Sequence, residues 1–184
     1  MRRHALPLFA VSVALSCAIP GTAQAKNENT WATISDIGAY GLIAVSIGTP
    51  LVKGDTNGAL QAGGSVAAAT LVSQGLKEAF PELRPDGSDR KSFPSGHTAN
   101  AFAAAASLYN RQGAAVGIPA MAVATLVGVA RVQADKHHWY DAVAGGAVGL
   151  TAGFLITRDR PDRRMALVPW GDSKGGGISF AMRF

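Results

Sequence analysis

Residues 91–100 have the sequence KSFPSGHTAN, and Pro94-Ser95-Gly96-His97 stands at the centre of this stretch. A proline and a glycine enclose a serine directly before an Ala-rich run, which predicts a loop that ends at the N-terminus of a helix. Such an N-terminus offers free backbone N–H groups and the positive end of the helix dipole. We therefore expect an anion pocket here, with His97 beside it.

The composition favours a membrane-associated protein with anionic partners. Of the 184 residues, 48% are hydrophobic and only 16% are charged, which is well below the charge content of a typical soluble domain. The net charge of +5 suits phosphate esters and acidic lipids. Because the basic residues are dispersed and lack an aromatic-basic platform, we expect no nucleic-acid partner.

The N-terminus has the layout of a secretory signal. A basic start, Met1-Arg2-Arg3, precedes an apolar run over 5–19 and a cleavage pattern at Ala23-Gln24-Ala25. We predict cleavage after Ala25, with an uncleaved anchor helix as the alternative; both outcomes export the rest of the chain to the cell envelope. The only cysteine, Cys17, lies in this segment, so neither an intrachain disulfide nor a cysteine metal site can form.

Five segments of helical character come after a polar linker at 26–30, and their connections are short and polar. They are 34–52, 58–80, 98–109, 114–132 and 141–157. This pattern predicts an all-α fold, a helical bundle of about five core helices. In the last segment Gly145, Gly149 and Gly153 recur every fourth residue, which lets a second helix approach closely, as in membrane bundles. We favour a membrane-embedded bundle; Ala/Gly-rich helices also pack closely in soluble all-α domains, which remain the alternative.

The C-terminal residues differ in character from the helical segments. A charged linker over 158–164 precedes two short segments, 166–170 and 178–184, with a Gly-rich turn between them. Apolar residues alternate along the second segment, which predicts a β-hairpin. The sequence therefore divides into a signal or anchor over 1–25, a helical domain over 26–157 and a linker with a hairpin-like tail over 158–184.

Three polar clusters are predicted to meet at one end of the bundle. The first is Lys77 with Arg84-Pro85, the second is the turn at Pro94–His97, and the third is Arg131 with His137 and Asp141. If helix direction alternates, the connections after the second and fourth segments emerge on the same side. All three clusters would then surround the anion pocket.

The residue types in these clusters suit a phosphoryl group. Its negative charge spreads over the equatorial oxygens during transfer, so a protein must mainly position it and neutralise that charge. Three side chains supply cations and the turn supplies hydrogen bonds: Lys77, Arg84, Arg131, Ser95 and the Gly96 N–H. We predict that these groups bind phosphate.

Two histidines complete the chemistry. Asp141 follows His137 at i+4, within reach on a helix, and a carboxylate on one imidazole nitrogen leaves the other as a nucleophile. His97, when protonated, can protonate the leaving alkoxide as a general acid. No step in this scheme needs a metal or another cofactor.

The clusters resemble the three motifs of the type 2 phosphatidic acid phosphatase (PAP2) superfamily: K-x6-RP, PSGH and SR-x5-H-x3-D. Here they are Lys77-(EAFPEL)-Arg84-Pro85, Pro94-Ser95-Gly96-His97 and Arg131-(VQADK)-His137-(HWY)-Asp141. The resemblance implies a phosphohistidine at His137, supported by Asp141, with His97 as the acid. It also implies that Lys77, Arg84, Ser95, Gly96 and Arg131 hold the phosphate.

Two features depart from the family pattern. Ala130 stands where the third motif has serine, and the stretch from Pro85 to Pro94 is short, which leaves little room for a capping element. His138, next to the predicted nucleophile, is its competitor for that role.

The leading interpretation is a metal-independent phosphatase in the inner membrane, with its active site facing the periplasm. Its substrate would be a phosphorylated lipid: phosphatidic acid, phosphatidylglycerol phosphate, an isoprenoid pyrophosphate or a lipid A type phosphate. A soluble domain would instead favour a periplasmic acid phosphatase for small phosphomonoesters. A vanadium haloperoxidase, for which the chain is short, and a non-catalytic lipid-phosphate binder are the remaining alternatives; binding alone would not need His97, His137 and Asp141.

Overall fold

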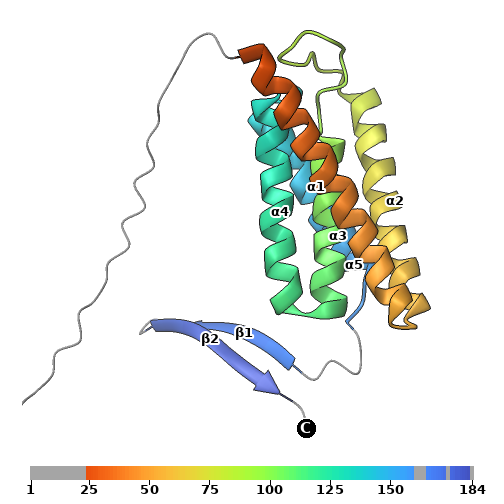
Figure 1. Cartoon of the computed structure of the whole chain (residues 1–184), viewed down its shortest axis with the longest axis vertical. Helices are drawn as coiled ribbons and strands as arrows, with labels where there is room; N and C mark the ends of the chain where they lie inside the picture. Colours follow the sequence, from red (N-terminus) through yellow and green to blue (C-terminus); the bar gives the residue numbers. More distant parts are fainter. Residues whose placement is uncertain (1–23, 160–164, 173–174, 183–184) are drawn as a thin grey trace, which may run out of the picture.

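The computed structural model describes residues 24–159, 165–172 and 175–182. Within these ranges the chain folds into five helices followed by two strands (Figure 1). They are α1 (Gln24–Val52), α2 (Thr56–Ala79), α3 (Gly96–Gln112), α4 (Ala114–Gln133), α5 (Trp139–Ile156), β1 (Met165–Asp172) and β2 (Gly175–Met182). The predicted helical bundle with a C-terminal hairpin is confirmed.

The structure departs from the sequence prediction at the start of α1 and agrees with it at the C-terminal hairpin. The prediction of a polar linker at 26–30 is wrong, because α1 already begins at Gln24. Lys26 and Glu28 in this stretch are good helix formers. The predicted signal segment lies almost entirely outside the described residues. At the other end, β1 pairs antiparallel with β2 from Met165↔Met182 to Asp172↔Gly175, as expected for a hairpin.

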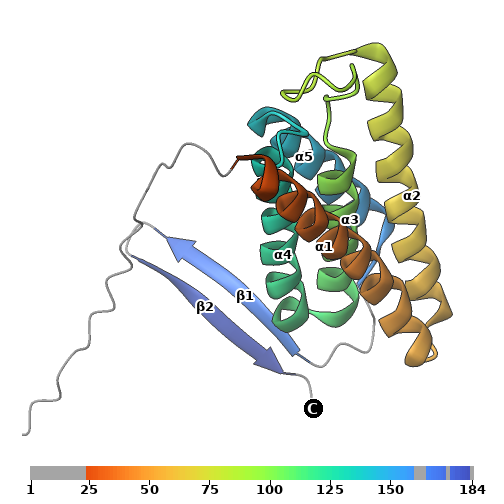
Figure 2. The same cartoon turned by 45° about the horizontal axis from the view of Figure 1, so that its top comes forward.

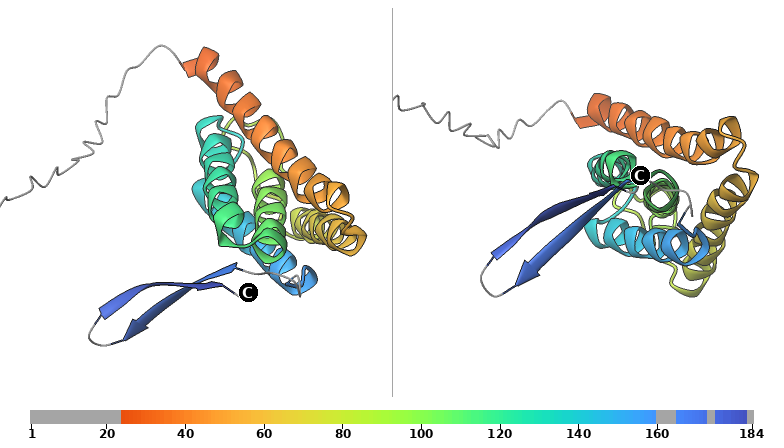
Figure 3. Two further views of the ribbon diagram at one scale, coloured as in Figure 1. Left: turned by 60° about the horizontal axis from the view of Figure 1, so that its bottom comes forward. Right: turned by 90° about the horizontal axis from the view of Figure 1, so that it is seen from below.

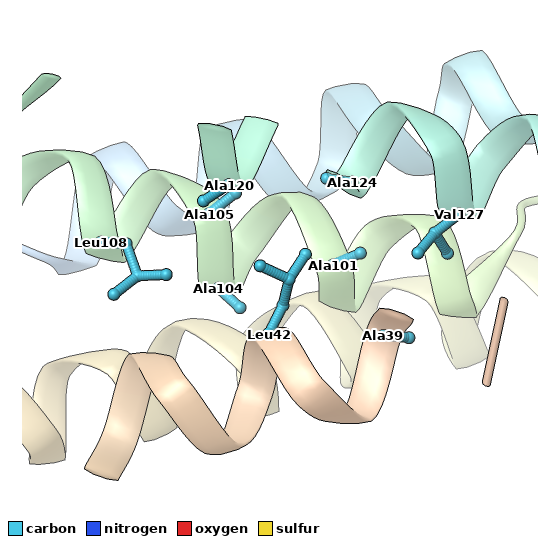
Figure 4. Close-up of a cluster of buried hydrophobic side chains, with 9 residues drawn as sticks. All are labelled: Ala39, Leu42, Ala101, Ala104, Ala105, Leu108, Ala120, Ala124 and Val127. Carbon is cyan, nitrogen blue, oxygen red and sulfur yellow. The ribbon is translucent and has the colours of Figure 1, made fainter. Parts of the chain in front are cut away.

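Helix α3 is the central element of the bundle. The view along the bundle shows the other four helices around it (Figure 3), and α3 contacts each of them. Between Ala99 and Ala106 every buried position is alanine, and these small side chains let four helices come close at once. Larger side chains such as Leu42, Leu108 and Val127 fill the remaining space between α1, α3 and α4 (Figure 4).

Glycines on α5 bring that helix against the backbone of α3. A Cβ at Gly149 would collide with the Ala99 carbonyl oxygen and lie 2.9 Å from the Ala103 nitrogen. A Cβ at Gly145 would collide with the Ser95 carbonyl oxygen. The predicted close approach at the glycine repeat is therefore confirmed, and it fixes the start of α3 against α5.

Polar contacts join the helices at the end of the bundle where α2 begins. The buried Thr157 hydroxyl lies 2.9 Å from Ser65 Oγ and 2.8 Å from Ser107 Oγ, which links α2, α3 and the end of α5. Arg111 donates from Nε to Asp55, the N-cap of α2, at 3.0 Å. These contacts close one end of the bundle, and the motif residues lie at the other.

The outer surface of the bundle carries many large apolar side chains, whereas its interior is filled mainly by small ones. Large exposed side chains occur on several helices, among them Ile37, Leu60, Leu71, Val143 and Leu155. Among the described helices, three are long and apolar enough to cross a membrane: Asn27–Val52, Ala114–Gln133 and Trp139–Ile156. Small residues inside and large apolar residues outside are the distribution expected of a membrane bundle.

We predict that Gly149→Ala destabilises the bundle by about 1–3 kcal/mol, because its Cβ has no space against the α3 backbone. Gly63→Ala on α2 is the matched control, since nothing lies within 4 Å of a Cβ there and alanine favours helix by up to about 1 kcal/mol. Thermal unfolding of the two purified variants in detergent measures the difference. Equal stability of Gly149→Ala and wild type would contradict the packing described here.

Candidate active site

The three motif clusters meet at one end of the bundle. The end of α2, the start of α3, the end of α4 and the start of α5 lie together there, beside the loop that joins α2 to α3 (Figures 1 and 2). The topology predicted from alternating helix direction is confirmed. Residues 81–95 form the connecting loop, in which Ser92 N donates to the Glu82 carbonyl at 3.0 Å.

Lys77, in the last turn of α2, binds the loop before α3. Its Nζ donates to the carbonyl oxygens of Lys91 at 2.8 Å, Ser92 at 3.4 Å and Pro94 at 2.5 Å. Burial, and after it the nearby charge of Arg84, lowers the pKa of Lys77 to about 8. Lys77 is thus a cation of the site and also the tie that holds the loop against α2.

Arg84 is held within the same loop. Its Nε donates to Asp89 Oδ1 at 2.7 Å, and its backbone N–H donates to the Asp89 carbonyl at 3.0 Å. These contacts orient the guanidinium, whose charge lowers the pKa of both Lys77 and His137. Arg84 therefore lies within electrostatic range of Lys77, from its own motif, and of His137, from the third motif.

The turn at Pro94–His97 ends at a helix N-terminus, as predicted. Ser95 is the N-cap of α3, and its Oγ accepts from the Thr98 N–H at 3.4 Å. The Ser95 N–H in turn donates to the Asp141 carbonyl at 3.0 Å, which joins the turn to α5. Gly96 is the first residue of α3, so its N–H is among those that have no partner inside the helix.

His137 is buried in the middle of the cationic groups. Its side chain is 2% exposed, and Nδ1 lies 2.8 Å from the Ser92 carbonyl oxygen. Because a carbonyl oxygen only accepts, Nδ1 carries the proton and Nε2 keeps its lone pair. Burial lowers the pKa of His137 to about 3, and Arg131, Lys77 and Arg84 contribute in that order. The ring is therefore neutral at physiological pH.

Asp141 supports His137 by a different route from the one its spacing suggested. The shortest distance from its carboxylate to His137 Nδ1 is 3.7 Å, which is too long for a hydrogen bond. Asp141 Oδ2 instead accepts from Ser92 Oγ at 2.5 Å and from His138 N at 2.8 Å. The fully buried carboxylate thus fixes Ser92, whose carbonyl orients His137.

His138, the competitor for the role of nucleophile, lies on the outer side of Asp141. Its ring stacks on Tyr140 at 5.0 Å between centroids and lies 3.7 Å from Glu82 Oε1. Ligand atoms of Glu82, His138 and Asp141 lie within 4.8 Å of one another, which is a geometry that could hold a cation. Two carboxylate oxygens near His138 already accept hydrogen bonds: Glu82 Oε1 from Tyr140 and Asp141 Oδ2 from Ser92.

His97 is paired with a residue that the sequence motifs do not contain. Its Nε2 lies 3.0 Å from Asp36 Oδ1 on α1, and the Tyr40 ring meets the imidazole edge-on at 6.0 Å. Burial and then the charge of Arg131 lower the pKa of His97, whereas Asp36 raises it. The sequence did offer one signal for Asp36, a carboxylate surrounded by apolar residues in a helical segment, because charged residues in membrane segments are functional candidates.

Arg131 is a buried cation with an unpaired hydrogen-bond donor among the described residues. Its side chain is 8% exposed, and Nη1 lies 3.4 Å from Ser35 Oγ and 3.8 Å from Asp36 Oδ1. Its buried Nε has no hydrogen-bond partner among the described residues. An unpaired buried donor costs about 1–3 kcal/mol, and an anion bound beside it would remove that cost.

One end of the helical bundle thus brings together a neutral histidine with a free lone pair, three surrounding cations and a second histidine held by a carboxylate, which are the groups expected of a phosphatase site. Residues 58–165 match the profile of the PAP2 superfamily. The chain belongs to the PAP2 superfamily, as its three motifs predict.

Relatives of known function include two lipid A phosphatases. The lipid A 1-phosphatase of Porphyromonas gingivalis is 38% identical over 88 residues, which are 46% of this chain and 20% of that protein. The lipid A 4'-phosphatase of Helicobacter pylori is 30% identical over 141 residues, which are 66% of this chain and 71% of that protein. The chain thus matches only a fifth of the first relative and most of the second.

Two solved structures share the fold. Aquifex aeolicus LpxE aligns with a TM-score of 0.61 at 20% identity, over 71% of this chain and 85% of that one. The transmembrane PAP2 type phosphatidylglycerolphosphate phosphatase of Bacillus subtilis aligns with a TM-score of 0.58 at 25% identity, over 72% and 76%. The three candidate spans and the likeness to the transmembrane Bacillus subtilis phosphatase support a membrane protein.

We predict that Asp36→Asn lowers the pKa of His97, because the variant loses the carboxylate that favours the imidazolium. In the same titration, His137 should stay neutral in both proteins until the pH approaches 3. Imidazole chemical shifts followed by NMR against pH measure both rings. Asp135→Asn is the control, since Asp135 is not among the main groups that shift the pKa of either histidine. A His137 ring that titrates near 6.5 would contradict the buried, neutral state.

Proposed function

We propose that the protein is a metal-independent lipid phosphatase that works through a phosphohistidine at His137. The observation that carries the proposal is the hydrogen bond from His137 Nδ1 to the Ser92 carbonyl. It fixes the tautomer in which Nε2 keeps the lone pair, and burial keeps the ring neutral by lowering its pKa. Lys77, Arg84 and Arg131, the cations that lower the pKa of His137, are the groups that would neutralise a phosphoryl group at Nε2.

In the first step of this mechanism, His137 Nε2 attacks phosphorus and the bond from phosphorus to the leaving oxygen breaks. The three cations and the N-terminus of α3 stabilise the charge on the equatorial oxygens. Protonated His97 gives its proton to the leaving alkoxide. Asp36, 3.0 Å from His97 Nε2, favours the protonated imidazole that this step requires.

In the second step, water attacks phosphorus on the side opposite His137, and the phosphorus–nitrogen bond breaks. Neutral His97 now accepts a proton from the attacking water, so it returns to the state in which it began. Inorganic phosphate leaves and His137 Nε2 regains its lone pair. In the proposal Asp141 is a positioning residue, because it touches Ser92 and His138 rather than the reacting atoms.

Membrane placement and relatives both support a lipid phosphate as the substrate. The candidate spans carry the site at one end of the bundle, beside the headgroup layer in a membrane. The Porphyromonas gingivalis and Helicobacter pylori relatives act on lipid A, and the Bacillus subtilis neighbour is a phosphatidylglycerolphosphate phosphatase. We propose that the site faces the periplasm, that residues 26–157 form the catalytic domain and that 158–184 are an appended linker and hairpin.

We predict that His137→Ala abolishes phosphate release and the trapping of labelled phosphate on the protein, because the attacking nitrogen is lost. The loss should exceed about 1000-fold, the scale of removing a covalent nucleophile. His138→Ala is the matched control and should keep activity within about tenfold. Its Nδ1 lies 3.3 Å from Asp141 Oδ2 and 3.4 Å from Ser92 Oγ, but the bond between Ser92 and Asp141 does not need it. Full turnover by His137→Ala with loss in His138→Ala would show that the nucleophile is misassigned.

The same assay run in EDTA tests the metal-independent part of the proposal. Activity of wild type should be unchanged, because each proposed step uses only side chains and water. The group formed by Glu82, His138 and Asp141 is where a required cation would bind. Activity that disappears in EDTA and returns with added metal would contradict the mechanism, and loss of that response in His138→Ala would locate the ion.

A further inference from the structure

A small pocket adjoins the proposed phosphate site and shares three residues with it. Its volume is about 190 Å³, and it lies between α1, α2 and α3 with Lys77, Gly96 and His97 at one end. From there it extends to Thr70, Ser73 and Asn100, toward the middle of the helices. A group attached to the phosphate would enter it.

The wall of this pocket on α2 is polar and runs from the exposed Gln74 to the buried Ser73. Thr70, Ser73, Gln74 and Lys77 occur at i, i+3, i+4 and i+7, so they lie on a single helix face. Thr70 Oγ1 donates to Asn100 Oδ1 at 2.9 Å across the pocket. The bond between Thr70 and Asn100 links α2 to α3, and Lys77 holds the loop before α3. Neither contact gives a structural role to Ser73, which lies between Thr70 and Lys77 on α2.

Ser73 is the residue that points to a ligand. Its side chain is 1% exposed, it lines the pocket, and its Oγ has no hydrogen-bond partner among the described residues. Two other buried serines of α2 and α3 do have partners: Ser65 with Gln61 and Thr157, and Ser107 with Ala103 and Thr157. A buried hydroxyl left unpaired costs free energy that alanine at this position would avoid.

We propose that this pocket binds a hydroxyl-bearing carrier of the phosphate, a sugar or a polyol, through a hydrogen bond to Ser73 Oγ. The inference rests on the proposed phosphatase function and narrows its substrate class. A sugar or glycerol unit has hydroxyls within a few bonds of the phosphate and fits the volume of the pocket. Ala39 and Ile43 of α1 form an apolar wall opposite the polar one, which suits the carbon face of such a unit. A plain hydrocarbon carrier would leave Ser73 unpaired.

The test compares lipids that differ in this hydroxyl. Phosphatidylglycerol phosphate and a diacylated glucosamine 1-phosphate carry free hydroxyls on the unit that bears the phosphate, whereas phosphatidic acid carries none. Wild type should have a kcat/KM at least about tenfold higher on one of the first two than on phosphatidic acid, the size of one good hydrogen bond. Ser73→Ala should lower the higher value by about 3- to 10-fold and leave phosphatidic acid within about twofold.

Two further variants separate recognition from folding. Gln74→Ala changes an exposed residue of the same pocket wall and should reduce the preference in the same direction. Ser65→Ala removes a paired hydroxyl from the same helix, so it should lower thermal stability without changing the preference. Equal losses on all lipids in Ser73→Ala, or a wild type that prefers phosphatidic acid, would overturn the inference. A wild type that releases phosphate from none of the lipids would contradict the proposed function, and this inference with it.

Discussion

The backbone carbonyl of Ser92 is the contact on which the site depends. It accepts from His137 Nδ1 at 2.8 Å and from Lys77 Nζ at 3.4 Å, while the hydroxyl of the same residue donates to Asp141 at 2.5 Å. One loop residue therefore sets the tautomer of His137, the proposed nucleophile, receives a cation from α2 and is fixed by a carboxylate of α5. Because these partners come from separate elements, the site exists only when the whole end of the bundle is assembled.

The sequence was sufficient to predict the helical bundle and to predict that the three motif clusters meet at one end of it. Apolar periodicity predicted the helices, and the glycine repeat predicted the close contact that the glycines of α5 make with α3. The direct bond expected between His137 and Asp141 was not found, because α5 begins at Trp139 and His137 lies before it. The i+4 geometry holds only when both residues belong to one helix.

The contacts that the sequence did not reveal are those between distant segments. Ser92 acts through its carbonyl, a group that every residue carries, so no residue pattern marks it. Asp36 meets His97 only because α1 packs beside α3. The same packing encloses the polar pocket. The sequence could not predict that the Ser73 hydroxyl is buried without a partner among the described residues, because this depends on the neighbouring helices. In each case the residue type determines which interactions are possible, and the tertiary packing determines which partner the residue meets.

A structure of the protein with vanadate tests the central claim most directly, because vanadate adopts the geometry of a phosphoryl group in transfer. We predict vanadium bonded to Nε2 of His137, with its oxygens near Arg131, Lys77 and the N-terminus of α3, and with Nδ1 still bonded to the Ser92 carbonyl. Vanadium bonded to His97 or His138, or a His137 ring turned so that Nδ1 faces the oxyanion, would contradict it.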